Sequence, residues 1–358
     1  MRVLVATDAW RPQVNGVVRT YERLDEEVRK LGVELAIVSP AEFRSIPCPT
    51  YPEIRLAVPG YQYLIERVAC IRPDAVHIAT EGPVGWMMRA YCIGRRIPFT
   101  TSFHTRFPDY LRSRFFIPVD WTFAAQRRFH NASAGMMVAS KSLADELGAR
   151  GFQKIMPWTR GVDTNLFRPR GERLFGDGPI FIYVGRVAIE KNIEAFLKLD
   201  LPGRKVVVGA GPMLDVLRSR YPDVTFLGKL VGEDLARAYA SADVFCFPSK
   251  TDTFGIVLLE AMASGVPIAA YPVTGPIDIV RQGVSGVLDE DLRTACLGAL
   301  ACARSAVRNE AVTFSWESAG RMFLSNIETA LFASQGRAVP ARRRGLAQRR
   351  RQTTATTG

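Results

Sequence analysis

Two acidic residues flank the predicted start of a helix in the stretch SKTDTFGIVLLEAMASG, Ser249 to Gly265. Asp252 precedes a glycine-containing turn, and Glu260 lies about one helical turn beyond Ile256 on the same face. A helix that begins here would offer its first backbone amides to an anion. These are the amides of Phe254, Gly255, Ile256 and Val257, and the residues of helix-capping type before them are Thr251, Asp252 and Thr253. The pattern favours an anion with a hydroxyl-bearing group on each side, which is the anatomy of a nucleotide sugar.

Two cationic side chains follow another predicted strand. In YVGRVAIEKNIE the strand ends at Gly185, whose missing side chain lets the backbone approach a ligand closely. Arg186 and Lys191 follow in the connecting loop and would neutralise a diphosphate. A solvent-exposed loop would contain the same residue types. The two cations therefore predict a diphosphate site only in combination with the acidic stretch from Ser249 to Gly265.

Each acid taken singly fits an acidic cap or an exposed helix glutamate. The string as a whole, however, resembles the signature of glycosyltransferase family 4, whose members are retaining enzymes with the GT-B fold. The matching positions are Asp252, Glu260, Ala261, Gly265 and Pro267. The family more often has Glu at the first of these positions. The shorter Asp252 keeps the capacity to accept hydrogen bonds from sugar hydroxyls and leaves the identity of the sugar open.

The resemblance extends over nearly the whole chain and implies roles for the residues of the acidic and cationic stretches. Arg186 and Lys191 would hold the leaving diphosphate, together with the amides of the predicted helix. Glu260 would bind the ribose hydroxyls, and Asp252 would bind hydroxyls of the donor sugar.

Three further motifs are similar to those of the family. Gly16, in RPQVNGVVRTYERL, would let the backbone of the first domain approach the diphosphate. Gly209 and Gly211, in VVVGAGPM, would shape the nucleoside pocket. His104, in TTSFHTRFPDY, matches the histidine that the family points at the donor sugar. Of the other histidines, His77 is expected in the core, and His130 is given no role.

Family resemblance implies retention of the anomeric configuration, and the sequence offers no obvious nucleophile paired with a general acid. We therefore expect a same-face substitution in which a departing phosphate oxygen accepts the proton of the acceptor hydroxyl. The residues nominated for catalysis are His104, Arg186, Lys191 and Asp252. No metal and no cofactor are expected. The acidic string Asp289 to Asp291 superficially matches a metal motif, but capping of the helix that follows explains it better.

The order of apolar and amphipathic segments predicts the architecture. Continuous apolar runs alternate with helical stretches, as in a parallel sheet covered on both faces. The same alternation begins again after an irregular stretch from Trp158 to Pro179. The predicted fold is α/β of the GT-B type, with two doubly wound, Rossmann-like domains facing each other across a cleft. We expect an acceptor and membrane domain at 1–160, a nucleotide-sugar domain at 161–312, a helix at 313–334 that returns to the first domain, and a disordered basic tail at 335–358.

Composition excludes several other classes. The chain of 358 residues begins with an apolar run that soon meets Asp8, so we expect a buried first strand and no signal peptide. No apolar window is long enough to span a bilayer. The six cysteines are scattered without metal or redox spacing, and free, mostly buried thiols are expected. We expect a cytoplasmic protein attached peripherally to the inner face of the cell membrane.

Basic and aromatic residues alternate between Phe103 and Phe129, as suits an interface with anionic lipid. A helix that buries its aromatic side chains and exposes its arginines explains the same pattern equally well. The tail from Arg337 to Arg351 supplies seven of the twelve net positive charges and would strengthen membrane attachment, or alternatively bind nucleic acid without specificity. The residues nominated for membrane contact are Arg112, Arg114, Phe115, Phe116, Trp121, Arg127 and Arg128.

The preferred interpretation is a hexosyltransferase that moves glucose or glucuronic acid from a UDP-sugar to a membrane lipid such as diacylglycerol, with no specific nucleic-acid partner. A GDP-mannose-dependent mannosyltransferase acting on a phosphoinositide or glycolipid is the alternative. A nicotinamide-dependent dehydrogenase is disfavoured because no Gly-x-Gly-x-x-Gly motif opens either domain. A non-enzymatic membrane or nucleic-acid binder driven by the tail remains the third hypothesis.

Overall fold

The computed structural model of the chain describes residues 1–13, 15–48, 51–58, 60–104 and 119–334. The nominated residues Arg112, Arg114, Phe115 and Phe116, and the whole basic tail, lie outside the described residues.

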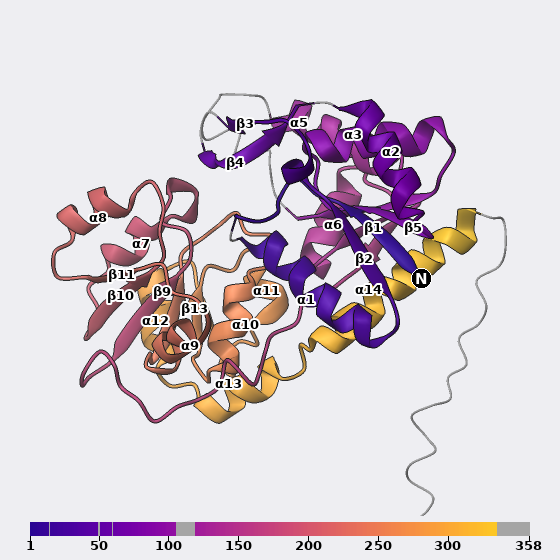
Figure 1. The fold of residues 1–358 in the computed structure, drawn as a ribbon. Coiled ribbons are helices and arrows are strands. Elements are labelled where there is room, and N and C mark those ends of the chain that lie inside the picture. Colours follow the sequence, from indigo (N-terminus) through magenta and orange to yellow (C-terminus); the bar gives the residue numbers. More distant parts are fainter. Residues whose placement is uncertain (14, 49–50, 59, 105–118, 335–358) are drawn as a thin grey trace, which may run out of the picture.

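The first half of the chain forms a six-stranded parallel sheet with helices on both faces (Figure 1). Its strands, in spatial order, are β2 (Glu34–Val38), β1 (Arg2–Ala6), β5 (Ala75–Ile78), β6 (Phe99–Phe103), β7 (Gly135–Val138) and β8 (Ile155–Pro157). The helices are α1 (Gly16–Lys30), α2 (Tyr61–Ile71), α3 (Pro83–Gly94), α5 (Val119–His130) and α6 (Lys141–Ala149). The central strands are buried along their whole length, which explains their uninterrupted apolar sequences.

The second half repeats this plan. Its parallel sheet has the order β11 (Thr225–Gly228), β10 (Arg204–Val208), β9 (Ile180–Val184), β12 (Val244–Phe247), β13 (Ile268–Ala270) and β14 (Gly286–Leu288). The helices are α7 (Ile193–Leu197), α8 (Leu214–Arg220), α9 (Gly232–Ala240), α10 (Ile256–Ala263), α11 (Pro276–Ile279), α12 (Leu292–Ala299) and α13 (Arg304–Ala311). The prediction of two doubly wound α/β sheets is therefore confirmed.

A two-stranded antiparallel hairpin of β3 (Ser45–Cys48) and β4 (Tyr51–Ala57) was not predicted. It is inserted between β2 and α2, and it is not part of either parallel sheet. Prolines at Pro47 and Pro52 interrupt the apolar alternation that would have marked both strands. The hairpin lies on the far side of the first domain from α14, as Figure 1 shows.

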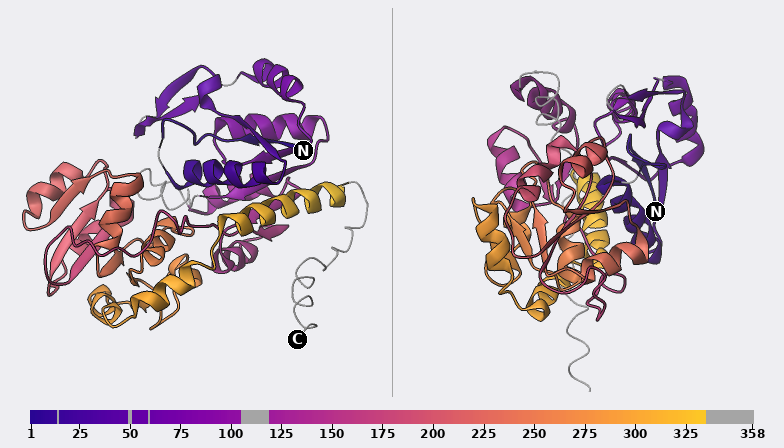
Figure 2. Two further views of the ribbon diagram at one scale, coloured as in Figure 1. Left: turned by 60° about the horizontal axis from the view of Figure 1, so that its bottom comes forward. Right: turned by 90° about the vertical axis from the view of Figure 1, so that its left-hand side faces the viewer.

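The last helix, α14 (Trp316–Ser334), crosses back from the second sheet and packs along α1 (Figure 2). Phe323 and Ile327 of this helix are buried in the core of the first sheet. The indole Nε1 of Trp158 donates a hydrogen bond to the carbonyl oxygen of Ala319 over 3.1 Å. The start of α14 is equally fixed, because a side chain at Gly161 would lie 2.3 Å from the backbone nitrogen of Trp316. The chain therefore passes between the domains twice, once from β8 to β9 and once from α13 to α14.

The order of the strands predicts where a ligand site should lie. The direction of winding reverses between β1 and β5 in the first sheet and between β9 and β12 in the second. Ligands of doubly wound sheets bind beyond the carboxyl ends of the strands at these points. Gly16 follows β1, Arg186 follows β9 and Asp252 follows β12.

Candidate functional site

Among the residues that the structure describes, no side chain caps the start of helix α10. Its N-cap residue is Gly255, which has a left-handed backbone conformation with a φ of 88°. The expectation that Thr251, Asp252 or Thr253 caps this helix is therefore wrong, because the turn at Gly255 leaves those three residues in the preceding loop. The first amides of a helix have no intrahelical acceptor. With no capping side chain, they are suited to bind an anion.

The first turn of α1 lies against the first turn of α10. A side-chain carbon added at Gly16 would be 3.9 Å from Cδ1 of Ile256, an ordinary van der Waals contact. Helix α1 is capped by Asn15, whose Oδ1 accepts hydrogen bonds from the amides of Val17 and Val18, both over 3.0 Å. Two helix N-termini from different domains therefore converge. Because each carries a partial positive charge, an anion between them would be stabilised by both.

One turn further along both helices, an ion pair joins the domains. Nη1 of Arg19 lies 3.0 Å from Oε1 of Glu260, whose side chain is only 5% exposed. The hydroxyl of Tyr239 donates to the other carboxylate oxygen over 3.1 Å. Burial raises the pKa of Glu260, and the charge of Arg19 and both hydrogen bonds oppose this rise. The sequence indicates Glu260 but not Arg19 or Tyr239. The one available signal is that Arg19 follows Gly16 by three residues, which places both on the same face of the helix.

Lys191 and Asp252, which were nominated separately, form a second ion pair. Nζ of Lys191 lies 2.5 Å from Oδ1 of Asp252, and both side chains are largely shielded from solvent. Among the described residues, nothing hydrogen-bonds the buried second oxygen Oδ2 of Asp252. The loops that carry the pair are tied together, because Nδ2 of Asn192 donates to the carbonyl oxygen of Pro248 over 3.1 Å. An unsatisfied buried carboxylate oxygen is the feature that a ligand hydroxyl would satisfy.

Three glycines shape the loops beside this pair. Gly209 has a φ of 145°, and a side chain there would lie 1.8 Å from the carbonyl oxygen of Gly185. A side chain at Gly211 would lie 2.3 Å from the carbonyl oxygen of Val187. The backbone of Arg186 is held in the same region, because its carbonyl oxygen accepts a hydrogen bond from the hydroxyl of Tyr183 over 2.9 Å. The contribution of these residues to nucleotide binding stays a prediction.

His104 lies after β6, next to the loop that carries Asp252. Its carbonyl oxygen accepts a hydrogen bond from the hydroxyl of Thr253 over 2.8 Å, which is another contact between the domains. Its ring Nδ1 is 3.2 Å from Nη2 of Arg160, and its Nε2 is 3.1 Å from the hydroxyl of Tyr21. Because a guanidinium can only donate, Nδ1 is the acceptor and the proton is on Nε2. Burial, reinforced by the charge of Arg160, lowers the pKa of His104 well below its usual value. The imidazole is therefore neutral, and its role towards a sugar stays a prediction.

Arg160 is a buried cation in the irregular stretch from Trp158 to Pro179, the linker between the two domains, and the sequence predicts no role for it. Its side chain stacks over the ring of Trp158 at 4.0 Å, and the residue is 3% exposed. It donates to the carbonyl oxygens of Trp158 and Thr159 over 2.6 and 3.1 Å, besides its bond to His104. Burial lowers the pKa of Arg160 to about 10, which still leaves it charged at neutral pH. No pattern in the sequence distinguishes it from the other arginines of the linker.

The remaining histidines have structural partners. His77 is fully buried, as expected, and its Nε2 lies 2.8 Å from the hydroxyl of Tyr21. Burial, followed by the charge of Arg160, lowers the pKa of His77 to about 3. His130 is also fully buried, and its Nε2 is 3.0 Å from Oε1 of Glu81.

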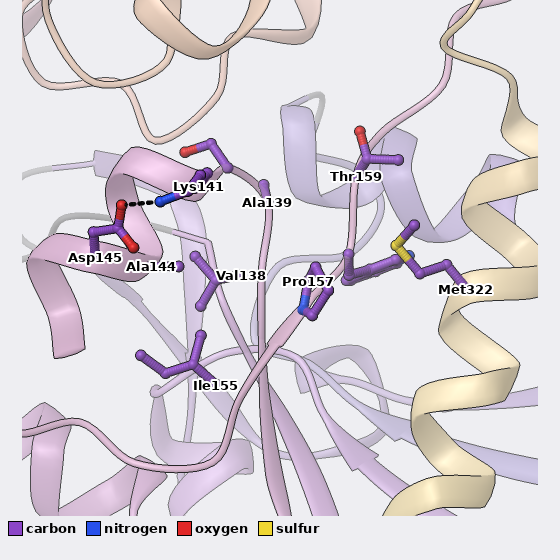
Figure 3. Close-up of a pocket in the computed structure, with 11 residues that line it drawn as sticks. Val138, Ala139, Lys141, Ala144, Asp145, Ile155, Pro157, Thr159 and Met322 are labelled. Atoms are coloured by element: carbon purple, nitrogen blue, oxygen red, sulfur yellow. Dashed lines mark hydrogen bonds and ion pairs between the residues drawn. The ribbon is translucent and has the colours of Figure 1, made fainter.

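A hollow with a volume of about 380 Å³ lies beyond the carboxyl ends of β7 and β8 in the first sheet (Figure 3). It is bounded by the end of β7, the start of α6, the segment after β8, and Met322 of α14. Its lining is mainly apolar, and the ion pair of Lys141 and Asp145 lies on one side of it, as Figure 3 shows. The hollow contains none of the residues nominated for the donor. It shares Trp158 with the environment of Arg160.

The described part of the basic and aromatic stretch divides between core and surface. Phe123 and Phe129 of α5 are buried, whereas Trp121 on the same helix is 75% exposed. Arg127 makes an intramolecular contact, because its Nη1 donates a hydrogen bond to the carbonyl oxygen of Arg150 over 3.0 Å. Arg128 is exposed. Within the described residues, no helix has both the length and the apolar character to cross a bilayer.

Two expectations about other motifs are confirmed. Asp291 caps α12, since its carboxylate accepts hydrogen bonds from the amides of Arg293 and Thr294 over 3.1 and 3.3 Å. Cys70, Cys92, Cys246, Cys296 and Cys302 are free thiols, and of these five Cys70 alone is exposed. No group of three or more His, Cys, Asp and Glu side chains in the described ranges is arranged to hold a metal ion.

Comparison with protein families gives a match for each half of the chain. Residues 14–166 match the model described as Glycosyltransferase Family 4. Residues 178–302 match the model described as Glycosyl transferases group 1. Together the two matches include every residue nominated for the donor site.

Three curated relatives represent the sequence matches. A GDP-mannose-dependent alpha-mannosyltransferase of Mycolicibacterium smegmatis is 32% identical over 320 residues, which cover 80% of this chain and 84% of the relative. The sulfoquinovosyl transferase SQD2 of Arabidopsis thaliana is 30% identical over 76% of this chain, but the match spans only 60% of that longer protein. An alpha-monoglucosyldiacylglycerol synthase of Streptococcus pneumoniae is 25% identical over 84% of this chain and 78% of its own length.

The solved structure of HepE from Anabaena in complex with UDP-glucose has the same fold. Its TM-score is 0.71 at 13% identity, and the superposition covers 92% of this chain and all of HepE. At this level of identity the similarity supports the architecture of two facing α/β domains.

Proposed function

The chain belongs to glycosyltransferase family 4 and has the GT-B fold, and from that premise we propose that it transfers a hexose from a nucleotide sugar to a membrane lipid. The observation that carries the proposal is the convergence of the N-termini of α1 and α10 at Gly16 and Ile256. A diphosphate between these two helix ends would be stabilised by both dipoles. The flanking pairs Arg19–Glu260 and Lys191–Asp252 would supply carboxylates for hydroxyl groups and cations for phosphate oxygens.

The proposed reaction is a substitution on one face of the sugar. As the bond between the sugar and the phosphate lengthens, negative charge grows on the diphosphate. Arg186, Lys191 and the amides at the start of α10 would stabilise that charge more in the transition state than in the ground state. A departing phosphate oxygen accepts the proton of the acceptor hydroxyl, and the configuration at the anomeric carbon is retained. Asp252 would orient the sugar through its hydroxyls, its unsatisfied Oδ2 included.

Two features of the first domain support a lipid acceptor. Trp121 places a large apolar side chain in solvent, which is favourable where the surface meets a membrane. The apolar hollow beside Trp158 could receive the apolar part of an acceptor close to His104. The pneumococcal relative, a synthase named for a glucosylated diacylglycerol, supports diacylglycerol as the first acceptor to test. Membrane attachment on the cytoplasmic face follows from the same proposal.

The donor has two candidates. UDP-glucose or UDP-glucuronic acid is our first choice, and HepE, whose structure contains UDP-glucose, is a neighbour of the same fold. GDP-mannose is the second candidate, because the mycobacterial relative is named for that donor and is 32% identical. Glu260 would bind the ribose in either case and does not distinguish the two bases.

The proposal is tested by offering the purified chain radiolabelled UDP-glucose, UDP-glucuronic acid and GDP-mannose in separate reactions. Each reaction contains vesicles of phosphatidylglycerol with diacylglycerol or phosphatidylinositol, and the lipids are then extracted into an organic phase. We expect label from one donor to enter that phase. Label that remains aqueous for every donor and acceptor would refute the lipid acceptor, and the release of free sugar alone would show hydrolysis without transfer.

A further inference from the structure

We propose that Arg19 is a ligand of the nucleotide diphosphate that Glu260 holds in the ligand-free protein. Binding of a nucleotide sugar would then be an exchange of partners. The ribose hydroxyls take over Glu260, and the released guanidinium turns to the diphosphate. This inference rests on the proposed function, because it names a further residue of the same donor site.

The first observation is that both carboxylate oxygens of Glu260 already have hydrogen-bond partners within the protein. Its Oε1 contacts Arg19 at 3.0 Å and its Oε2 accepts from Tyr239 at 3.1 Å. Its side chain is nearly inaccessible. Arg19, by contrast, is the partly exposed member of the pair and comes from the other domain. A ribose that hydrogen-bonds Glu260 must therefore replace Arg19, since Tyr239 is fixed in the core of the second domain.

The second observation is the register of the two helices. Gly16 faces Ile256 in the first turns, and Arg19 faces Glu260 one turn later. One helical turn advances about 5.4 Å. A released Arg19 side chain therefore needs to move by only about one turn to reach an anion at the helix ends. Arg19 and Gly16 are neighbours on the same helix face, so the side chain swings along its own helix.

The third observation is that the same arrangement occurs twice. Lys191 is paired with Asp252 at 2.5 Å, so each carboxylate nominated for a hydroxyl is joined to a cation suited to a phosphate. The two pairs together are electrically neutral without a ligand. A diphosphate adds negative charge while the hydroxyls of ribose and sugar add none, so the ligand favours separation of both pairs. Arginine is well suited to this role because its fork can bind two phosphate oxygens.

The test measures binding of UDP, UMP, GDP and GMP by calorimetry to the full chain and to three variants. Arg19→Ala removes the guanidinium, Arg19→Lys keeps a charge, and Arg23→Ala is the matched control. Arg23 lies on the next turn of α1 and forms its own long-range ion pair with Asp163, over 3.0 Å. For the base that binds, the decisive quantity is the ratio of the Kd of the monophosphate to the Kd of the diphosphate.

In Arg19→Ala we expect this ratio to fall about tenfold, as for loss of one charge-assisted hydrogen bond. The Kd of the monophosphate should stay the same or decrease, because Glu260 is then open to the ribose. Arg19→Lys should recover part of the ratio, and Arg23→Ala should leave it unchanged. If the Arg19–Glu260 ion pair only holds the two domains together, both Kd values should shift by the same factor in Arg19→Ala and their ratio should stay constant. This result would overturn the inference.

Two controls separate the possible failures. If Arg19→Ala does not fold, Glu260→Gln provides the same test, because it releases Arg19 in place. In that variant the ratio should rise above that of the wild type, because Arg19 is no longer held by a charged carboxylate, and an unchanged or lower ratio would contradict the inference. A wild-type chain that binds neither UDP nor GDP would refute the proposed function and the inference with it, whereas a constant ratio in Arg19→Ala refutes the inference alone.

Discussion

The guanidinium of Arg160 donates a hydrogen bond to Nδ1 of His104 over 3.2 Å, and this contact fixes the protonation of the imidazole. Because arginine cannot accept, His104 must carry its proton on Nε2, where it faces Tyr21. A buried cation thus keeps a neutral histidine at the contact between the domains. The carbonyl oxygen of the same His104 accepts from Thr253, so this residue links Arg160 to the loop of Asp252.

Replacement of Arg160 by Met should slow transfer more than it weakens nucleotide binding. The change keeps an apolar side chain against Trp158 and removes the donor to His104. We expect kcat to fall by about tenfold or more, as for loss of an oriented group, with a Kd for the nucleotide that changes by less than about threefold. Activity and calorimetry on the same preparation measure both values. A loss confined to nucleotide affinity would contradict the positioning role.

Stability should fall as the pH drops below 6.5. The folded pKa of His77 is lowered to about 3, so the unfolded state binds the extra proton between these two values. His77 alone should cost about 1.6 kcal/mol of unfolding free energy between pH 6.5 and pH 5.0, because the slope rises from about 0.7 kcal/mol per pH unit at pH 6.5 towards about 1.4 at pH 5.0. Urea titrations of wild type and His77→Gln at the two pH values measure this difference. Equal pH dependence in both proteins would show that His77 is not held neutral.

Substitutions of Glu260 and Arg186 should affect different quantities, the first nucleotide affinity and the second the turnover rate. Glu260→Ala should weaken nucleotide binding by about 1.5 to 3 kcal/mol, because the ribose loses a charged acceptor. Arg186→Ala should chiefly lower kcat, by about a hundredfold, because its charge acts most strongly on the leaving diphosphate. Steady-state kinetics with the accepted donor distinguish the two patterns. Equal and negligible effects would remove both residues from the site.

Trp121 should contribute to membrane attachment. Trp121→Ala removes an exposed ring, and burial of a large apolar side chain contributes about 1.5 to 3 kcal/mol. The partition coefficient onto phosphatidylglycerol vesicles, measured by cosedimentation, should therefore decrease about tenfold or more. Ile189→Ala is the matched control, since Ile189 is 73% exposed on the second domain and should not alter partitioning. Unchanged cosedimentation of Trp121→Ala would exclude α5 from the interface.

Local sequence predicted the elements well because their signal is local. The strand Ile180–Val184 is buried at every position, and its uninterrupted apolar letters express this directly. The start of α10 was placed correctly but its cap was not, because Asp252 and Thr253 have strong capping propensity while the observed cap depends on the left-handed backbone at Gly255.

The partners of the nominated residues could not be predicted in the same way. Arg19 and Glu260 are 241 positions apart and meet only because two domains bring their helices together. Arg160 lies in a linker without regular periodicity, and its importance comes from burial beside Trp158 and His104, which composition does not reveal. Sequence therefore indicated the loops that we propose for the donor site, whereas the pairing of charges between them required the fold.

The central claim is that a diphosphate binds between the first turns of α1 and α10. A crystal structure of the full chain with UDP or GDP tests it most directly. We expect phosphate oxygens within hydrogen-bond distance of the amides of Ile256 and Val257, with Arg186 or Lys191 beside them and Asp252 released from Lys191. A diphosphate bound elsewhere, or protein atoms still covering the first turn of α10 in the complex, would contradict the account.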